Sequence, residues 1–348
     1  MPAPRLYARH DAAGQAKYQD VKQLARAQAR VLAGTPGTLK HRTQSGRKYW
    51  VREHLRADGR KVDEYLGPEA ALEPEQREVL RAELDLAKAL AAGSARLRLF
   101  GYQRLDRKPA AVLAVFFNHG LTRAGLTLVG SLAYGVLLNE LGVLAPGYRT
   151  QDIDVARARA LALALPDEMS FQQLLRETGL PFVPVPGMPS HRPSASFKLP
   201  GAEALLVDLL APGRNVGEIV AVKELNAHAQ AIPLLGFLIE DPIDAIVLSP
   251  NHVIPVKVPA PERFALHKLY ASQSRRSARD KIRKDLDQAA LLAAVIEEDT
   301  PGRLREAFRH VPAEARTAIR RGAVAAARLL HGVRPEAEMV LQAIAGKS

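Results

Sequence analysis

The sequence contains no cysteine among its 348 residues. A chain without thiols has no disulfide framework, no thiolate nucleophile and no zinc–thiolate site. No segment approaches the roughly 18 consecutive apolar residues that a membrane-spanning helix needs. The N-terminal residues also lack the apolar core of a signal peptide. These absences predict a soluble, cytoplasmic protein without a membrane partner.

Negative charge is also scarce. The chain has 49 Lys and Arg against 37 Asp and Glu, which gives a net charge of +12. Residues 1–67 hold fourteen basic and six acidic side chains, and residues 262–288 hold eight and four, so these two segments carry the whole excess. Concentrated positive charge favours a polyanionic partner such as RNA, DNA or nucleotide phosphates. The alternative explanation for this basic excess is the codon usage of a GC-rich genome, which favours arginine.

Changes in hydrophobic periodicity divide the chain into three parts. Residues 1–98 predict a basic helix, a three-stranded meander with tight turns at Ser45-Gly46 and Asp58-Gly59, and a charged linker helix. Residues 99–258 alternate short strands with helices, and residues 259–348 are helical throughout after a double-proline break. The predicted fold class is therefore α+β, and the oligomeric state is left open.

Three aspartates are candidate metal ligands. Asp152 and Asp154 stand two residues apart in a predicted strand, so their Cα atoms lie about 7 Å apart on one face. Asp208 lies inside an apolar strand, where an ionised carboxylate needs a compensating charge. Carboxylates in such an arrangement suit Mg²⁺ or Mn²⁺. The alternative is an exposed strand face for the first two and an edge position for Asp208.

The dipeptide Gly130-Ser131 joins a short apolar strand directly to a helix. Glycine allows a phosphate to approach the backbone closely, and the free N–H groups at a helix N-terminus favour negative charge. The Ser131 hydroxyl adds a donor. Alternatively, Ser131 is only the N-cap of the helix.

Val129-Gly130-Ser131, Asp152-Ile153-Asp154 and the later Asp208 together resemble the signature of the nucleotidyltransferase superfamily, which has a DNA polymerase β-like palm. These motifs and the segment 258–268 also resemble an uncharacterised bacterial group with that fold, over about residues 100–295. The segment between Ser131 and Asp152 is longer than the superfamily's usual spacing. The resemblance implies a mixed-sheet palm between a small N-terminal helix-plus-β-meander module and a C-terminal helical domain.

The resemblance also implies roles for particular residues. Asp152, Asp154 and Asp208 would bind Mg²⁺ or Mn²⁺, and Asp208 would in addition activate the acceptor hydroxyl. Gly130 and Ser131 would hold the phosphates of an NTP such as ATP, and Lys268 would reach its triphosphate. The implied reaction is transfer of an NMP from the NTP to an acceptor, with release of pyrophosphate.

The charge distribution makes RNA, such as a tRNA end, the preferred acceptor, and RNA modification would suit a toxin or defence factor. A protein side chain or a small molecule is an alternative acceptor. A non-catalytic nucleotide- or RNA-binding protein on the same fold is the alternative function.

Two basic surfaces are candidate RNA contacts. One strand face of the N-terminal module carries Trp50, Arg52 and Arg56, a combination that can stack on bases and pair with phosphates. Trp50 can instead pack the meander onto a helix, because a small sheet needs one buried face. A C-terminal helix carries the second surface, Arg275, Arg279 and Arg283, at i, i+4 and i+8. This stripe can instead be a solvated helix face.

Overall fold

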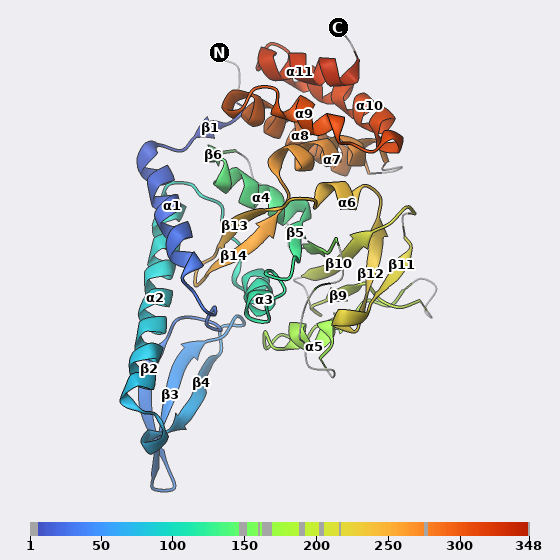
Figure 1. Cartoon of the computed structure of the whole chain (residues 1–348). Coiled ribbons are helices and arrows are strands. Elements are labelled where there is room, and N and C mark those ends of the chain that lie inside the picture. Colours follow the sequence, from blue (N-terminus) through green and yellow to red (C-terminus); the bar gives the residue numbers. More distant parts are fainter. Residues whose placement is uncertain are drawn as a thin grey trace.

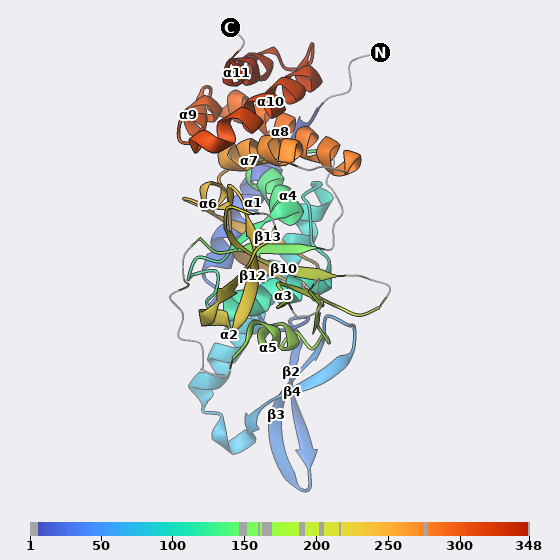
Figure 2. The same ribbon diagram turned by 90° about the vertical axis from the view of Figure 1, so that its right-hand side faces the viewer.

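The computed structural model describes residues 6–145, 152–158, 161, 169–187, 192–201, 205–215, 217–274 and 278–346. The molecule is a mixed α and β structure, as predicted, with three parts stacked along one axis (Figure 1; Figure 2). A three-stranded meander forms one end, a mixed sheet lies in the middle, and the C-terminal helices form the other end. Within the described ranges, no helix is long and apolar enough to cross a membrane.

The central sheet has the strand order β11-β12-β10-β7-β5, and β9 and β8 extend it beside β10. Its strands are β5 (Thr127–Val129), β7 (Ile153–Ala156), β8 (Val183–Pro184), β9 (Ser196–Lys198), β10 (Leu206–Pro212), β11 (Ile219–Val222) and β12 (Ala227–Ile232). β10 runs parallel to β7 and β12, whereas β5 and β11 are antiparallel to their neighbours. The four side chains of one face of β7 and β10 are at most 1% exposed: Ile153, Val155, Val207 and Leu209.

Helices cover this apolar face. The helices and turns of the middle region are α3 (Arg107–Asn118), α4 (Gly130–Glu140), α5 (Phe171–Arg176), η2 (Lys223–Leu225) and α6 (Leu235–Leu238). Phe171 of α5 stacks between Phe116 of α3 and Phe197 of β9, with ring centroids 5.3 and 5.4 Å apart. Phe197 pairs with Val207 across β9 and β10, so these rings lie on the core face. The intervening side chains of β7 and β10 therefore point to the opposite face.

The N-terminal module contains the predicted meander. Its elements are α1 (Ala12–Arg26), β2 (Thr38–Gln44), β3 (Arg47–Leu55), β4 (Lys61–Pro68), η1 (Glu69–Ala71) and α2 (Pro74–Leu99). Ser45 and Gly46 both have positive φ values, 50° and 75°, which is the geometry of a tight hairpin turn. The register of β3 with β4 shifts between Trp50 and Val51, so the strict alternation of faces that the sequence predicts is interrupted there.

The charged helix α2, which the sequence predicts as a linker, packs against α1. A Cβ on Gly93 of α2 would lie 2.7 Å from a methyl group of Val21 on α1, so the two helices cross closely. Ser94 Oγ donates a 2.7 Å hydrogen bond to the Ser249 carbonyl. Ser249 lies in the hairpin of β13 (Ile243–Leu248) and β14 (Val253–Val258), so this packing crosses the predicted boundary at residue 98.

Five helices form the C-terminal part: α7 (Pro261–Ser274), α8 (Arg279–Asp299), α9 (Arg303–Arg309), α10 (Ala313–Leu330) and α11 (Pro335–Ala345). The N-terminal segment reaches them. β1 (Ala8–Arg9) pairs with β6 (Val143–Leu144) of the middle region. Tyr7 donates a hydrogen bond to Glu298, and the Arg9 guanidinium lies 2.6 Å from Asp299 Oδ1. The start of the described chain therefore joins the middle region to α8.

Gly322 lies where α10 crosses α7, and a Cβ there would lie 2.4 Å from the Leu269 carbonyl oxygen. We expect Gly322→Ala to lower the free energy of unfolding by about 1–3 kcal/mol, because a helix backbone cannot move aside as a side chain can. Urea denaturation measures this. Gly236→Ala is the control, since its nearest foreign atom would be 3.8 Å away. Equal stability of the two variants would contradict the close crossing.

Candidate active site

The structure brings the three predicted aspartates together. Asp154 of β7 and Asp208 of β10 are direct partners in the parallel register. Because Ile153, Val155, Val207 and Leu209 occupy the core face, both carboxylates lie on the opposite face. Asp152 comes immediately before β7, not inside a strand as predicted, and its charge acts on both other aspartates.

Crowding of these carboxylates shows in their pKa values. Burial, followed by the negative charges of Asp208 and Asp152, raises the pKa of Asp154 to about 6, against the opposing effect of Lys268 and Lys284. The pKa of Asp208 is also raised, first by burial and then by Asp152, although a hydrogen bond from the Ser196 side chain opposes this. The site therefore concentrates negative charge that protein groups offset only in part.

Gly130 brings the β5–α4 turn against these carboxylates. Val129, the last residue of β5, pairs with Asp154, and α4 starts at the next residue. Gly130 has φ +66°, and a Cβ there would lie 1.9 Å from Asp154 Oδ2. Only glycine fits this position, because any side chain would collide with the carboxylate and strain the backbone. The turn and the aspartates thus form one site.

Ser131 is not the helix N-cap. The N-cap position of α4 is Val129 and has no side-chain capping bond. Ser131 Oγ instead accepts a 2.6 Å hydrogen bond from Lys284 Nζ of α8. The N-cap alternative for Ser131 is therefore wrong, and the hydroxyl points toward the other residues of the site.

Lys268 lies at the edge of this site in a buried ion pair. Its Nζ donates a 2.9 Å hydrogen bond to Asp285 Oδ1, and both side chains are nearly inaccessible, with 10% and 3% exposure. The ammonium also lies 5.2 Å from the centre of the Phe264 ring. Its charge lowers the pKa of Asp154, so Lys268 is near the carboxylates. Its role as a triphosphate contact stays a prediction.

Lys284 is a residue of the site that the sequence pattern alone did not predict. Burial and the nearby Lys268 lower its pKa, against the opposing charges of Asp285, Asp152 and Asp154. The sequence does indicate that this part of α8 faces the site, through Gln288 one helical turn later. Gln288 is fully buried, and neither polar atom of its side chain has a hydrogen-bond partner in the part of the chain that the structure describes. A buried glutamine marks an inward polar face of α8, which Lys284 shares at the i, i+4 spacing.

The C-terminal arginine stripe is only partly described. Arg275 lies outside the described residues. Arg279 is exposed. Arg283 is also exposed and donates from Nε to both carboxylate oxygens of Asp287, at 2.9 and 3.1 Å. The Arg283 charge is therefore partly neutralised within its own helix.

In the N-terminal module the structure does not support Arg52 as an RNA contact. Arg52 is 3% exposed. Its guanidinium pairs with Glu64 at 2.6 Å and donates to the carbonyls of Ala33, Thr35 and Pro36. These internal contacts hold the loop after α1 against the meander. Arg52 is consequently a structural residue, and its burial follows the register shift in β3.

Trp50 is half-buried. Its ring lies 3.6 Å from the His41 ring, at an angle of 43°. Its indole nitrogen is buried without a hydrogen-bond partner among the described residues. The ring therefore packs against a neighbouring strand of the meander. Packing onto a helix, the alternative interpretation, and stacking on a base both stay predictions.

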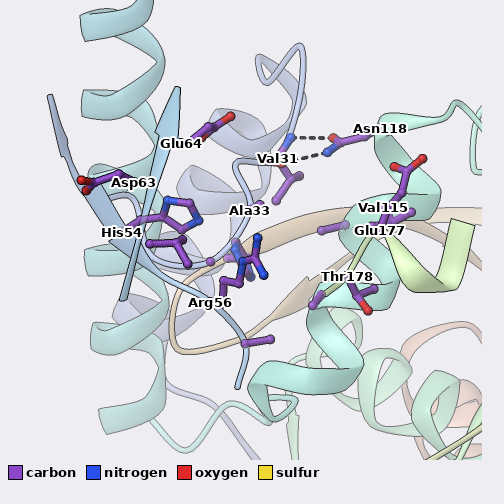
Figure 3. Close-up of a pocket in the computed structure, with 16 residues that line it drawn as sticks. Val31, Ala33, His54, Arg56, Asp63, Glu64, Val115, Asn118, Glu177 and Thr178 are labelled. Carbon is purple, nitrogen blue, oxygen red and sulfur yellow. Dashed lines mark hydrogen bonds between the residues drawn. The ribbon is translucent and has the colours of Figure 1, made fainter. Parts of the chain in front are cut away.

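Arg56 is exposed and lines a cavity of about 240 Å³ between the N-terminal module and the middle region. In Figure 3 its side chain lies between His54 and Thr178. The three acidic side chains that line this cavity all have basic side-chain partners, through the pairs Asp63–Arg42, Glu64–Arg52 and Glu177–His119. Arg56 has no ion pair with any residue that the structure describes. Arg56 therefore remains available as a predicted RNA contact, as does the exposed Arg279 of the C-terminal stripe.

A divalent cation fits the donor chemistry of the carboxylate site. Within the part of the chain that the structure describes, no three His, Asp or Glu side chains already stand in metal-binding geometry. The raised pKa values of Asp154 and Asp208 show, however, that added positive charge would be favourable there. Mg²⁺ typically uses one or two carboxylates together with substrate phosphates. The residues therefore fit a metal that binds with a nucleotide.

The class of protein follows from this geometry. A strand that continues through Gly130-Ser131 into a helix, beside Asp154 and Asp208 on adjacent strands, is the arrangement of a nucleotidyltransferase palm. A family model described as Nucleotidyltransferase matches residues 107–312, which is more than half of the chain. The chain belongs to this family and is a transferase enzyme, so the predicted superfamily is confirmed. No curated protein and no solved structure matches the chain significantly.

The raised pKa of Asp154, about 6 against 3.8 for the unperturbed group, predicts a pH-dependent cost in the metal-free protein. Because the folded state holds the proton more tightly, stability should fall as the pH rises from about 4 to 6. Asp154→Asn should therefore raise the free energy of unfolding at pH 7.5 by about 3 kcal/mol. The gain should vanish near pH 4.

Urea denaturation in EDTA at several pH values tests this expectation. The exposed Asp280, which precedes Lys284 on α8, provides the control Asp280→Asn. A wild-type protein that is as stable as Asp154→Asn at pH 7.5 would contradict the charge crowding.

Proposed function

We propose that the protein transfers an NMP from an NTP to an RNA acceptor. The observation that carries this proposal is the cross-strand pairing of Asp154 with Asp208 directly beside the Gly130-Ser131 turn. The family match supports nucleotidyl transfer in general. The acceptor, the metal and the assignment of individual residues are parts of the proposal.

Asp152, Asp154 and Asp208 would hold Mg²⁺ or Mn²⁺, which supplies neutralisation of the triphosphate charge when it is bound. Gly130 leaves room for the phosphates, and the Ser131 hydroxyl donates to one of their oxygens. The acceptor hydroxyl oxygen forms a bond to the α-phosphorus, while the bond from that phosphorus to the bridging oxygen of the β-phosphate breaks. The hydroxyl proton moves to Asp208, and pyrophosphate leaves.

RNA is favoured as the acceptor by the charge of the N-terminal module, which has an excess of eight basic residues in positions 1–67. Arg56 adds a specific candidate contact, because it is exposed at the cavity between this module and the palm. The module and the palm would therefore hold one RNA strand together. Modification would inactivate the RNA, which is the effect that a toxin or defence factor requires.

The activity is tested with each α-labelled NTP, Mg²⁺ or Mn²⁺, and total RNA. We expect label on RNA, and we expect Asp152→Asn and Asp154→Asn each to reduce it at least about 100-fold, because ligands of one metal site act as a unit. Asp280→Asn should retain activity. Retained transfer in either site variant would contradict the assignment, and label on protein alone would replace RNA as the acceptor.

The RNA contact is tested by fluorescence anisotropy over a salt series. Each lost phosphate contact should reduce the slope of log K against log[salt] by about 0.7 for a single strand. We expect Arg56→Ala to show this change without a change in thermal midpoint. The exposed Arg305 of α9 provides the control, Arg305→Ala, with an unchanged slope.

Arg52→Ala should behave differently from Arg56→Ala. It leaves Glu64 and three carbonyl groups without their guanidinium partner, so it should lower the thermal midpoint of the protein.

Equal RNA affinity and slope in Arg56→Ala and the wild type would remove Arg56 from the proposed interface.

A further inference from the structure

The contact between Lys284 and Ser131 connects two separate parts of the molecule. Lys284 belongs to α8 in the C-terminal helices, and Ser131 lies in the first turn of α4 beside Asp154. Their 2.6 Å hydrogen bond brings an ammonium group to the turn at which the proposed function places the phosphates. This contact joins residues that are 153 positions apart in the chain.

Lys268, the other lysine of the site, is already held in an ion pair. Lys268 and Asp285 form a buried pair at 2.9 Å, with exposures of 10% and 3%. Pulling the ammonium away from Asp285 would break a buried ion pair, which is costly because both charges lie away from water. Lys268 is therefore poorly placed to move to a ligand. By holding Asp285, it positions the adjacent Lys284 on α8.

The Lys284 ammonium, in contrast, is bound to a group that a ligand can replace. The Ser131 hydroxyl is a neutral acceptor, whereas a phosphate oxygen is anionic and forms a stronger, charge-assisted hydrogen bond. Lys284 is also only partly buried, so a ligand can reach it. When its ammonium leaves Ser131, the hydroxyl is released to donate to the same phosphate group.

We propose that Lys284 is a triphosphate-binding residue, whose ammonium exchanges the Ser131 hydroxyl for a phosphate oxygen when the nucleotide binds. This inference rests on the proposed function, because it assumes that the phosphates lie at the Gly130-Ser131 turn. It assigns to Lys284 the contact that the sequence predicts for Lys268. It also makes α8 part of the nucleotide site, which lies within the region that the family model matches.

The probe is inorganic tripolyphosphate with Mg²⁺, because it carries the phosphates without a base whose identity is unknown. Calorimetry on the full chain gives the dissociation constant for the wild type, Lys284→Gln and Lys281→Gln. Lys281 is exposed one turn earlier on α8. We expect Lys284→Gln to weaken binding about tenfold or more, and Lys281→Gln to leave it unchanged. Unchanged binding by a folded Lys284→Gln variant would overturn the proposal.

A second measurement needs no variant. Lysines of the wild-type protein are acetylated with and without Mg²⁺-tripolyphosphate, and the modified peptides are quantified by mass spectrometry. We expect the ligand to slow modification of Lys284 about fivefold or more, and to leave Lys281 unaffected. Acetylation requires the neutral amine, and contact with a phosphate favours the protonated form of the lysine. Equal rates at Lys284 with and without the ligand would overturn the proposal even if Lys284→Gln failed to fold.

Transfer of labelled NMP to RNA separates this inference from the proposed function. If the wild type transfers NMP but Lys284 is neither protected nor needed for binding, the Lys284 inference fails and the proposed function stands. If Lys284 is protected and required for tripolyphosphate binding but no NMP is transferred, the proposed reaction fails and the phosphate site stands. A wild type that binds no tripolyphosphate overturns the inference directly.

Discussion

Electrostatic repulsion among three aspartates is the constraint on which the rest of the site depends. Parallel pairing of β7 with β10 places Asp154 directly beside Asp208, and burial there raises the pKa of Asp154 to about 6. A steric constraint acts at the same place, because the turn approaches the Asp154 carboxylate so closely that no Cβ fits on Gly130. A site of this kind gains free energy from any cation that enters it, which is the property that binding a metal-bound nucleotide requires.

The cations that offset this charge come from the C-terminal helices. Lys268 of α7 and Lys284 of α8 both lower the pKa of Asp154, so these helices contribute to the site as well as covering it. Their position is supported from the other end of the chain, where Tyr7 and Arg9 bind the end of α8. The proposed nucleotide site is therefore assembled from parts that are distant in the sequence.

The N-terminal module shows how similar residues on one strand acquire different roles. Arg52 and Arg56 differ by four positions in the sequence. The register shift between Trp50 and Val51 accompanies burial of Arg52 under the loop that follows α1, where its guanidinium donates four hydrogen bonds to Glu64 and to backbone carbonyls. Arg56 lies just beyond the end of β3, where no described acid pairs with it. Only the second arginine can exchange water for a phosphate at little cost.

The sequence by itself determined the elements and the carboxylate motif. Alternating apolar residues, the turn residues Ser45-Gly46 and the Asp152-Ile153-Asp154 spacing are local signals, because they follow from periodicity and backbone conformation. It did not show that Ser131 binds Lys284, that Lys268 is neutralised by Asp285, or that Arg52 is buried. The tertiary structure decided these pairings, because the energy of a charged side chain depends on the groups that other segments place around it.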